Sequence, residues 1–269
     1  NSGGGMGNSN HGGPTLNDCT FTDNTATYGG GMYILDNQSQ TMTNCIFTSN
    51  TAVRGGGMLN YSNHTLTNCT FTGNSANLYG GGMYNQYSSP TLTNCTFKNN
   101  TAIKISGGGM YNKYSDPTLT DCTFTGNTAN SGGGMHNYDS ISTLDGCTFT
   151  GNTATVGGGL HNDNSSPNLD NCIFENNTAA AKGGVMCSVA SELTLTNCIL
   201  RYNISSDGGG LRNIDESGIT CTAALTGTTV CGNLPDQIVG TWIDNGGNTI
   251  NEFCWLDCNN NGIDDLVDI

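Results

Sequence analysis

The stretch Gly107-Gly-Gly-Met-Tyr-Asn112, followed by Leu119-Thr-Asp-Cys-Thr-Phe-Thr-Gly-Asn-Thr-Ala129, is one copy of a unit that recurs through most of the chain. Glycine triplets mark the units and return every 25 to 27 residues, with Gly-Gly-Val in place of one triplet. They begin at Gly3, Gly29, Gly55, Gly80, Gly107, Gly132, Gly157, Gly183 and Gly208. A fixed period of this length is typical of a solenoid, in which each unit buries its apolar side against its neighbours.

The pattern within one unit predicts three short strands. The residue after each triplet is always Met or Leu, whereas the next residue varies, so we expect Met110 to face inward and Tyr111 outward. Leu119 and Phe124 are five residues apart and face the same side only if the chain bends at Asp121, a residue type that tolerates corners. Three strands per unit predict an all-β, single-stranded parallel β-helix of about nine coils, each of about 25 residues, stacked about 4.8 Å apart.

A cysteine recurs in step with the glycines, and it has two interpretations. The thiols are either free and stacked as small buried hydrophobes, or paired as disulfides between neighbouring coils. Free thiols are favoured, because every coil supplies one and strand pairing already fixes the stack. This core ladder consists of Cys19, Cys45, Cys69, Cys95, Cys122, Cys147, Cys172 and Cys198. Outside it, we expect disulfides between Cys221 and Cys231 and between Cys254 and Cys258.

The charge of the chain limits its partners. The 269 residues include 7 Lys and Arg against 21 Asp and Glu, for a net charge of −14. Nucleic acids and anionic membranes need clustered cations, so we expect neither as a partner. No apolar run approaches the roughly 20 residues of a membrane-spanning helix, so we expect no membrane insertion.

The quoted unit resembles the polymorphic outer-membrane protein repeat and the wider right-handed β-helix repeat family of secreted bacterial proteins. The resemblance covers residues 1 to about 214. It implies a right-handed coil, an extracellular or cell-surface location, and a structural or adhesin-like role. Some relatives of this kind are polysaccharide lyases or hydrolases, but the resemblance supplies no catalytic residue for this chain. Three hypotheses follow: a structural or adhesive element, a glycan-binding module, and a polysaccharide-cleaving enzyme.

The sequence divides into three parts. Residues 1–214 hold the repeats, residues 215–253 a degenerate terminal coil and cap, and residues 254–269 a tail. In the degenerate coil, Thr228 falls at the ladder position of cysteine and Asn233 at the turn position of asparagine. We expect three aromatic side chains to cover the last coil, as solenoid ends require. They are Trp242, Phe253 and Trp255.

The tail has the spacing of a calcium-binding loop. Oxygen-bearing side chains fall at loop positions one, three, five, nine and twelve, a glycine at six, and a backbone carbonyl at seven. These residues are Asp257, Asn259, Asn261, Asp265 and Asp268, with Gly262 and Ile263. The tail resembles half of a dockerin or a thrombospondin type-3 repeat, from which it departs by Asp rather than Glu at position twelve. The alternative is a solvated acidic tail.

Aromatic and histidine side chains recur on the predicted outer face. The tyrosines there suit glycan stacking or protein contact, or they simply stabilise the coil. They are Tyr33, Tyr84 and Tyr111 in one column, with Tyr61, Tyr87, Tyr114 and Tyr138 a few residues on. His136 and His161 occupy the same column on adjacent units. Two imidazoles can bind a metal, but neither Tyr111 nor Cys187 beside them completes a site, so a plain surface pair is favoured.

Two further functions find little support. Outward threonine pairs resemble ice-binding solenoids, but other residues interrupt them and threonine simply suits strands. The pairs are Thr20/Thr22, Thr70/Thr72, Thr123/Thr125 and Thr148/Thr150. For catalysis, Arg54, Lys104 and Lys182 fall on separate coils, and no nucleophile–base constellation is evident, so we expect no enzyme.

The two ends of the chain also predict assembly. The aromatic segment is able to cover the last coil, whereas the chain starts inside a unit at Asn1. An uncapped coil recruits another strand, and contacts that do not close give filaments. We therefore expect head-to-tail self-association, or a longer rod whose first coils are missing here.

Overall fold

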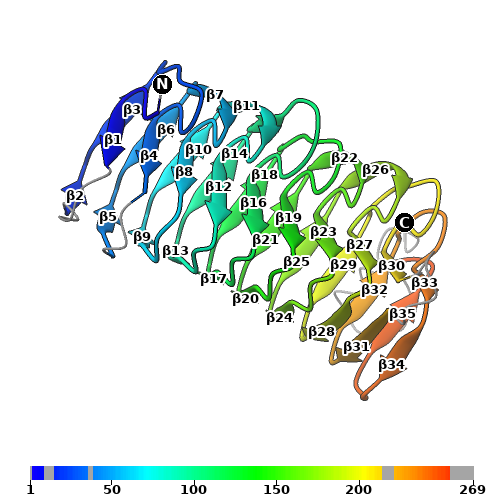
Figure 1. Cartoon of the computed structure of the whole chain (residues 1–269). Helices are drawn as coiled ribbons and strands as arrows, with labels where there is room; N and C mark the ends of the chain where they lie inside the picture. The colour runs from blue at the N-terminus through cyan, green and yellow to red at the C-terminus, as the bar shows by residue number, and fades with distance from the viewer. Residues whose placement is uncertain (1, 9–14, 36–38, 214–220, 255–269) are drawn as a thin grey trace, which may run out of the picture.

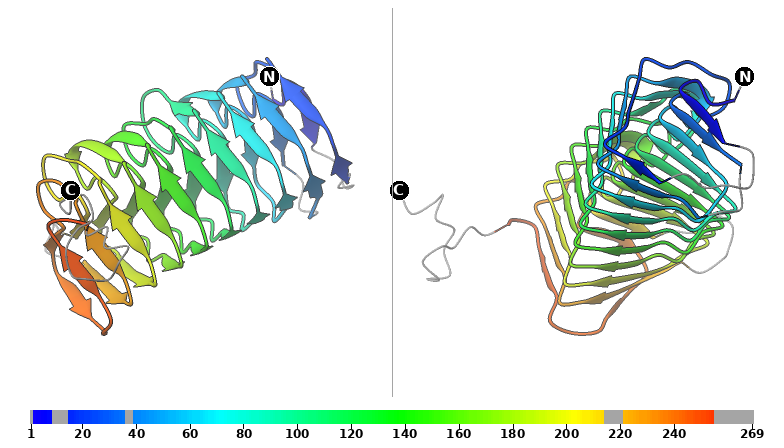
Figure 2. Two further views of the ribbon diagram at one scale, coloured as in Figure 1. Left: turned by 180° about the vertical axis from the view of Figure 1, so that it is seen from behind. Right: turned by 90° about the vertical axis from the view of Figure 1, so that its left-hand side faces the viewer.

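The computed structural model describes residues 2–8, 15–35, 39–213 and 221–254. They form a rod of stacked coils, with three ten-stranded parallel sheets running along its length (Figure 1). The right-hand view of Figure 2 looks toward one end of the rod and shows successive coils lying in register. The predicted parallel β-helix is confirmed. The described residues contain no helix long and apolar enough to cross a membrane.

The strands of each sheet come from successive coils. The first sheet contains β1 (Met6–Asn8), β4 (Met32–Ile34), β8 (Met58–Asn60), β12 (Met83–Gln86), β16 (Met110–Lys113), β19 (Met135–Tyr138), β23 (Leu160–Asp163), β27 (Met186–Val189), β30 (Leu211–Asn213) and β33 (Ile238–Gly240). The second contains β2 (Leu16–Asn17), β5 (Thr41–Thr43), β9 (Thr65–Thr67), β13 (Thr91–Thr93), β17 (Thr118–Thr120), β20 (Thr143–Asp145), β24 (Asn168–Asp170), β28 (Glu192–Thr196), β31 (Thr222–Thr226) and β34 (Trp242–Asp244). The third contains β3 (Thr20–Thr22), β6 (Ile46–Thr48), β10 (Thr70–Thr72), β14 (Thr96–Lys98), β18 (Thr123–Thr125), β21 (Thr148–Thr150), β25 (Ile173–Glu175), β29 (Ile199–Arg201), β32 (Thr229–Cys231) and β35 (Thr249–Asn251).

Two small sheets lie between the third sheet and the next strand of the first. One consists of β7 (Thr51–Arg54), β11 (Ser75–Tyr79) and β15 (Thr101–Ala102), and the other of β22 (Thr153–Val156) and β26 (Thr178–Lys182). The glycine triplet then turns the chain into the first sheet. Gly107 has a φ of +69°, and a Cβ on Gly108 would lie 2.4 Å from the carbonyl oxygen of Gly133 on the next coil. The triplet is therefore required both by a left-handed backbone and by close contact between coils.

The core is built from columns of like side chains. Met110, Leu119, Cys122 and Phe124 are all fully buried, as the alternation predicts, and Asp121 forms the corner between them with a φ of +52°. Phenylalanines at the position of Phe124 stack from coil to coil with ring centroids 4.6 to 4.9 Å apart. They are Phe21, Phe47, Phe71, Phe97, Phe124, Phe149 and Phe174.

The ladder cysteines are free thiols, and all except Cys19 are buried. Each finds a backbone acceptor, as Cys122 shows: its thiol donates to the carbonyl of Thr120 at 3.4 Å and contacts that of Leu92 at 3.7 Å. Thr228 is fully buried at the ladder position in the degenerate coil, where its hydroxyl donates to the carbonyl of Thr226 at 3.1 Å.

An internal ladder of asparagines, which the sequence analysis does not predict, joins the coils. The Asn127 amide donates to the carbonyl of Phe97 at 2.9 Å and to Oδ1 of Asn152 at 3.0 Å. Buried amides with all their hydrogen bonds satisfied stabilise a unique coil register. The ladder is Asn24, Asn50, Asn74, Asn100, Asn127, Asn152, Asn177, Asn203 and Asn233.

The disulfide expectations near the C-terminus are wrong where they can be compared with the structure. Cys231 bonds to Cys254, and Cys221 is a buried free thiol. The reason is that β35 pairs laterally with β32, which brings the residues after β35 next to Cys231. Cys258 lies outside the described residues. Trp242 packs against the core, whereas Phe253 is 68% exposed and does not cover the last coil; Trp255 lies outside the described residues.

Candidate functional site

Tyrosines gather on the outer side of the first sheet. Every tyrosine except Tyr202 lies in one series of ring contacts or packs against the outer cluster there. The series runs from just before β4 to β19, and it contains Tyr28, Tyr33, Tyr61, Tyr79, Tyr84, Tyr87, Tyr111, Tyr114 and Tyr138.

The part of this series nearest the sheet is buried, which corrects the predicted exposure of the outer column. Tyr84 and Tyr111 are 2% and 5% exposed and pack with Leu59. They do point away from the core, but Tyr79 covers them, with ring centroids 6.0 Å from Tyr84 and 4.8 Å from Tyr111. Burial accordingly raises the pKa of both buried phenols. Tyr33, in the same column, is half-buried.

The outer part of the series is exposed at a corner of the coil. Tyr87 is 65% and Tyr114 42% exposed, and their rings stack with centroids 5.1 Å apart and planes 11° apart. Tyr138 meets Tyr114 edge-on at 5.9 Å, and the ammonium of Lys113 lies 5.3 Å from the Tyr114 ring and 5.6 Å from the Tyr138 ring. We call these four residues, Tyr87, Lys113, Tyr114 and Tyr138, the tyrosine surface.

The backbone conformation at this corner is unfavourable for tyrosine. Tyr87 and Tyr114 have φ values of +52° and +51°, in the left-handed region. Asp139 and Asn164 adopt the same conformation at the same corner of the next two coils, and their residue types tolerate it better. A stack of two exposed aromatic rings, both held in an unfavourable backbone conformation, suggests a role in binding. This feature could have been found in the sequence, because Tyr87 and Tyr114 stand at the corner position that Asp139 and Asn164 occupy in the next two coils.

Two carboxylates border the tyrosine surface. Asp163 follows Tyr138 in register on the outer face of β23, and Asp139 adjoins Tyr138 along the chain. Burial first, and the charge of Asp139 second, raise the pKa of Asp163. Asn164 donates a hydrogen bond to the Asp139 carboxylate. With a net charge of −14 on the whole chain, this border disfavours anionic ligands.

The histidine pair is also buried rather than exposed, which corrects the predicted surface pair. His136 and His161 are 6% and 8% exposed and meet edge-to-face, with ring centroids 4.6 Å apart. His136 also contacts Tyr111 edge-to-face at 5.1 Å. Within the described ranges, no group of three His, Cys, Asp or Glu side chains is placed to hold a metal.

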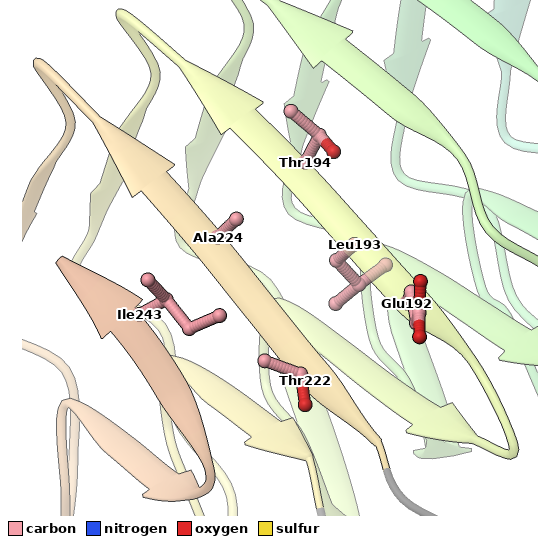
Figure 3. A pocket seen from close by; sticks show the side chains of 6 residues that line it. All are labelled: Glu192, Leu193, Thr194, Thr222, Ala224 and Ile243. Atoms are coloured by element: carbon pink, nitrogen blue, oxygen red, sulfur yellow. The ribbon is translucent and has the colours of Figure 1, made fainter. Parts of the chain in front are cut away.

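The remaining surface of the described residues offers shallow hollows. One, of about 210 Å³, opens on the outer face of the second sheet among side chains of β28, β31 and β34, with Glu192 at its rim (Figure 3). It is smaller than typical ligand pockets of roughly 300–1,000 Å³. Lys104 borders a wider, open hollow of about 470 Å³, while Arg54 lies between the rings of Tyr28 and Tyr79. These cations stay on separate coils, as does Lys182 on β26.

The predicted calcium loop, residues 257–268, lies outside the described residues.

Comparison with known proteins identifies one matching family. The family model of the right-handed β-helix region matches residues 2–108 and 60–264. No curated protein and no solved structure matches the chain.

Proposed function

The chain belongs to the right-handed β-helix family, and from this premise we propose that it is an extracellular adhesive protein that binds a glycan chain through the tyrosine surface. The observation that carries the proposal is the exposed stack of Tyr87 on Tyr114 in a left-handed backbone. Large apolar rings exposed at a corner are unfavourable for the free protein, and glycan binding would bury them.

The geometry favours a neutral, extended ligand. Ser62 occupies the preceding coil at this corner, so one face of Tyr87 has no aromatic neighbour among the described residues and is open to a sugar ring. Tyr114, Tyr138 and Lys113 continue the surface along the rod and offer phenol and ammonium donors to hydroxyl groups. The bordering Asp139 and Asp163 would repel uronates and sulfates.

The rod itself supports an adhesive role. Lateral strand pairing and the buried ladders hold each coil on its neighbours, so the surface stands on a rigid base. In this proposal residues 257–268 bind calcium, as their spacing predicts, and self-association of the rod would multiply weak glycan contacts. No catalytic step is part of it.

Affinity electrophoresis and pull-down with four neutral polysaccharides, namely cellulose, chitin, xylan and mannan, test the proposal. Tyr87→Asn and Tyr114→Asn remove the rings but keep a residue that Asn164 shows to fit this corner. If each ring contributes about 1 kcal/mol, each substitution should lower affinity about fivefold. Tyr202→Asn is the matched control, because Tyr202 is also exposed and left-handed but lies away from the surface. Equal retention of all variants, or no retention of the parent protein on any of the four, would refute the proposal.

A further inference from the structure

The histidine pair and the tyrosine surface share one face of the rod. Successive strands β16, β19 and β23 place Tyr111, His136 and His161 side by side in one outward column. Two residues further along the same strands, Lys113, Tyr138 and Asp163 form a second column. His136 and Tyr138 therefore lie on the same outer face of β19. His136 contacts Tyr111, and Tyr138 packs against the cluster that contains Tyr111, so this cluster links the histidine pair to the tyrosine surface.

The surroundings of His136 and His161 favour the neutral form of both imidazoles. Both imidazoles are more than nine-tenths buried, and Nδ1 and Nε2 of His136 and Nδ1 of His161 have no hydrogen-bond partner. Protonation would add a donor and a charge to a layer of aromatic rings. Burial lowers the pKa of His136 well below its ordinary value, with a smaller contribution from His161. Burial also lowers the pKa of His161 to about 4.

The charged groups around the pair do not reverse this preference. Asp163 shares the outer face of β23 with His161, yet the pKa of that histidine is still low. On the other side Cys187 follows His161 in the column, and beyond it Arg212 pairs with Asp207 at 2.6 Å. The titratable and charged groups on the surrounding elements are Tyr111, Lys113, Tyr138, Asp139, Asp163, Lys182, Cys187, Asp207 and Arg212.

We propose that the His136–His161 pair is an acid-operated release for the tyrosine surface. On acidification, protonation drives the imidazoles out of the aromatic layer, which displaces Tyr111 and Tyr138 and weakens the contact with a bound glycan. This regulation rests on the proposed function, whereas the opening of the layer does not. The free energy of opening falls as the pH falls, because exposed histidines bind protons more tightly than buried ones do.

The size of the effect follows from the two protonation equilibria. With an exposed value near 6.5, His161 alone should raise the population of the open layer about 20-fold between pH 7 and pH 5. His136 adds to this in the same direction.

Hydrogen exchange of the segments 135–138 and 160–163, corrected for intrinsic rates, measures the opening at pH 7 and pH 5. The matched variant is His136→Tyr with His161→Tyr, since Tyr84 and Tyr111 fill the same column on other coils. We expect exchange to be faster at pH 5 by at least about 20-fold in the parent, with little change in the variant. Equal rates at both pH values in the parent, or the same acceleration in both proteins, would overturn the proposal.

Retention on the four polysaccharides at the two pH values then tests the coupling. The parent should lose retention at pH 5, and the double variant should keep it. Retention that falls equally in both proteins contradicts coupling. If the parent binds none of them at pH 7, the proposed function fails, while the exchange result still decides whether the acid-operated opening exists.

Discussion

Replacing Phe124 by alanine should lower the free energy of unfolding by about 5 kcal/mol. Removal of a buried phenylalanine ring costs roughly 3–5 kcal/mol. Phe124 belongs at the upper end, because it is fully buried and stacks on both Phe97 and Phe149, at 4.7 and 4.6 Å. Phe21, which is half-buried and stacks only on Phe47, should lose about 2 kcal/mol on the same substitution, since less area and one ring contact are removed.

Guanidinium denaturation followed by circular dichroism measures these differences. Phe124→Leu is the conservative control, because Leu200 occupies the same column on a later coil, and it should cost about 1 kcal/mol. A loss below about 1 kcal/mol for Phe124→Ala would show that the ring is not in the core. Equal losses at Phe21 and Phe124 would contradict the contribution assigned to the stack.

Three further predictions concern titration, thiols and calcium. The free energy of unfolding should be highest above pH 6.5, near the pKa of histidine in the unfolded chain, and the contribution of His161 should lower it by about 3 kcal/mol at pH 4. The reason is that, as the pH falls, the unfolded chain binds the proton before the folded chain does. A free energy of unfolding that does not change with pH in urea melts would contradict this. Thiol labelling of the native protein should be slow at Cys122 and fastest at half-buried Cys19 among the ladder cysteines; rapid modification of Cys122, monitored by mass spectrometry, would place the ladder outside. Calorimetry should detect calcium binding that Asp257→Ala with Asp265→Ala abolishes, while chelation leaves the melting of the coils nearly unchanged; unaltered binding by that double variant would argue against the loop.

The sequence was sufficient to predict the direction of side chains but not what lies over them. Alternation places Met110 inward and Tyr111 outward, and the structure agrees. The burial of Tyr111 depends on Tyr79, which returns over the sheet from the preceding coil, and a single repeat does not reveal that contact.

Contacts between coils account for the other differences. The corner at Asp121 and the substitution of Thr228 into the cysteine ladder follow from residue type at a fixed period. The bond between Cys231 and Cys254 and the amide ladder through Asn127 join adjacent coils. They depend on lateral register in three dimensions, which the spacing along the chain leaves open.

Chemical nitration of tyrosine, with and without a saturating polysaccharide that retains the protein, tests the central claim most directly. In the free protein, Tyr87 and Tyr114 should react and the buried Tyr84 and Tyr111 should not. Bound polysaccharide should protect Tyr87 and Tyr114 and leave Tyr202 as reactive as before. Undiminished nitration of Tyr87 and Tyr114 in the complex would show that the glycan binds elsewhere.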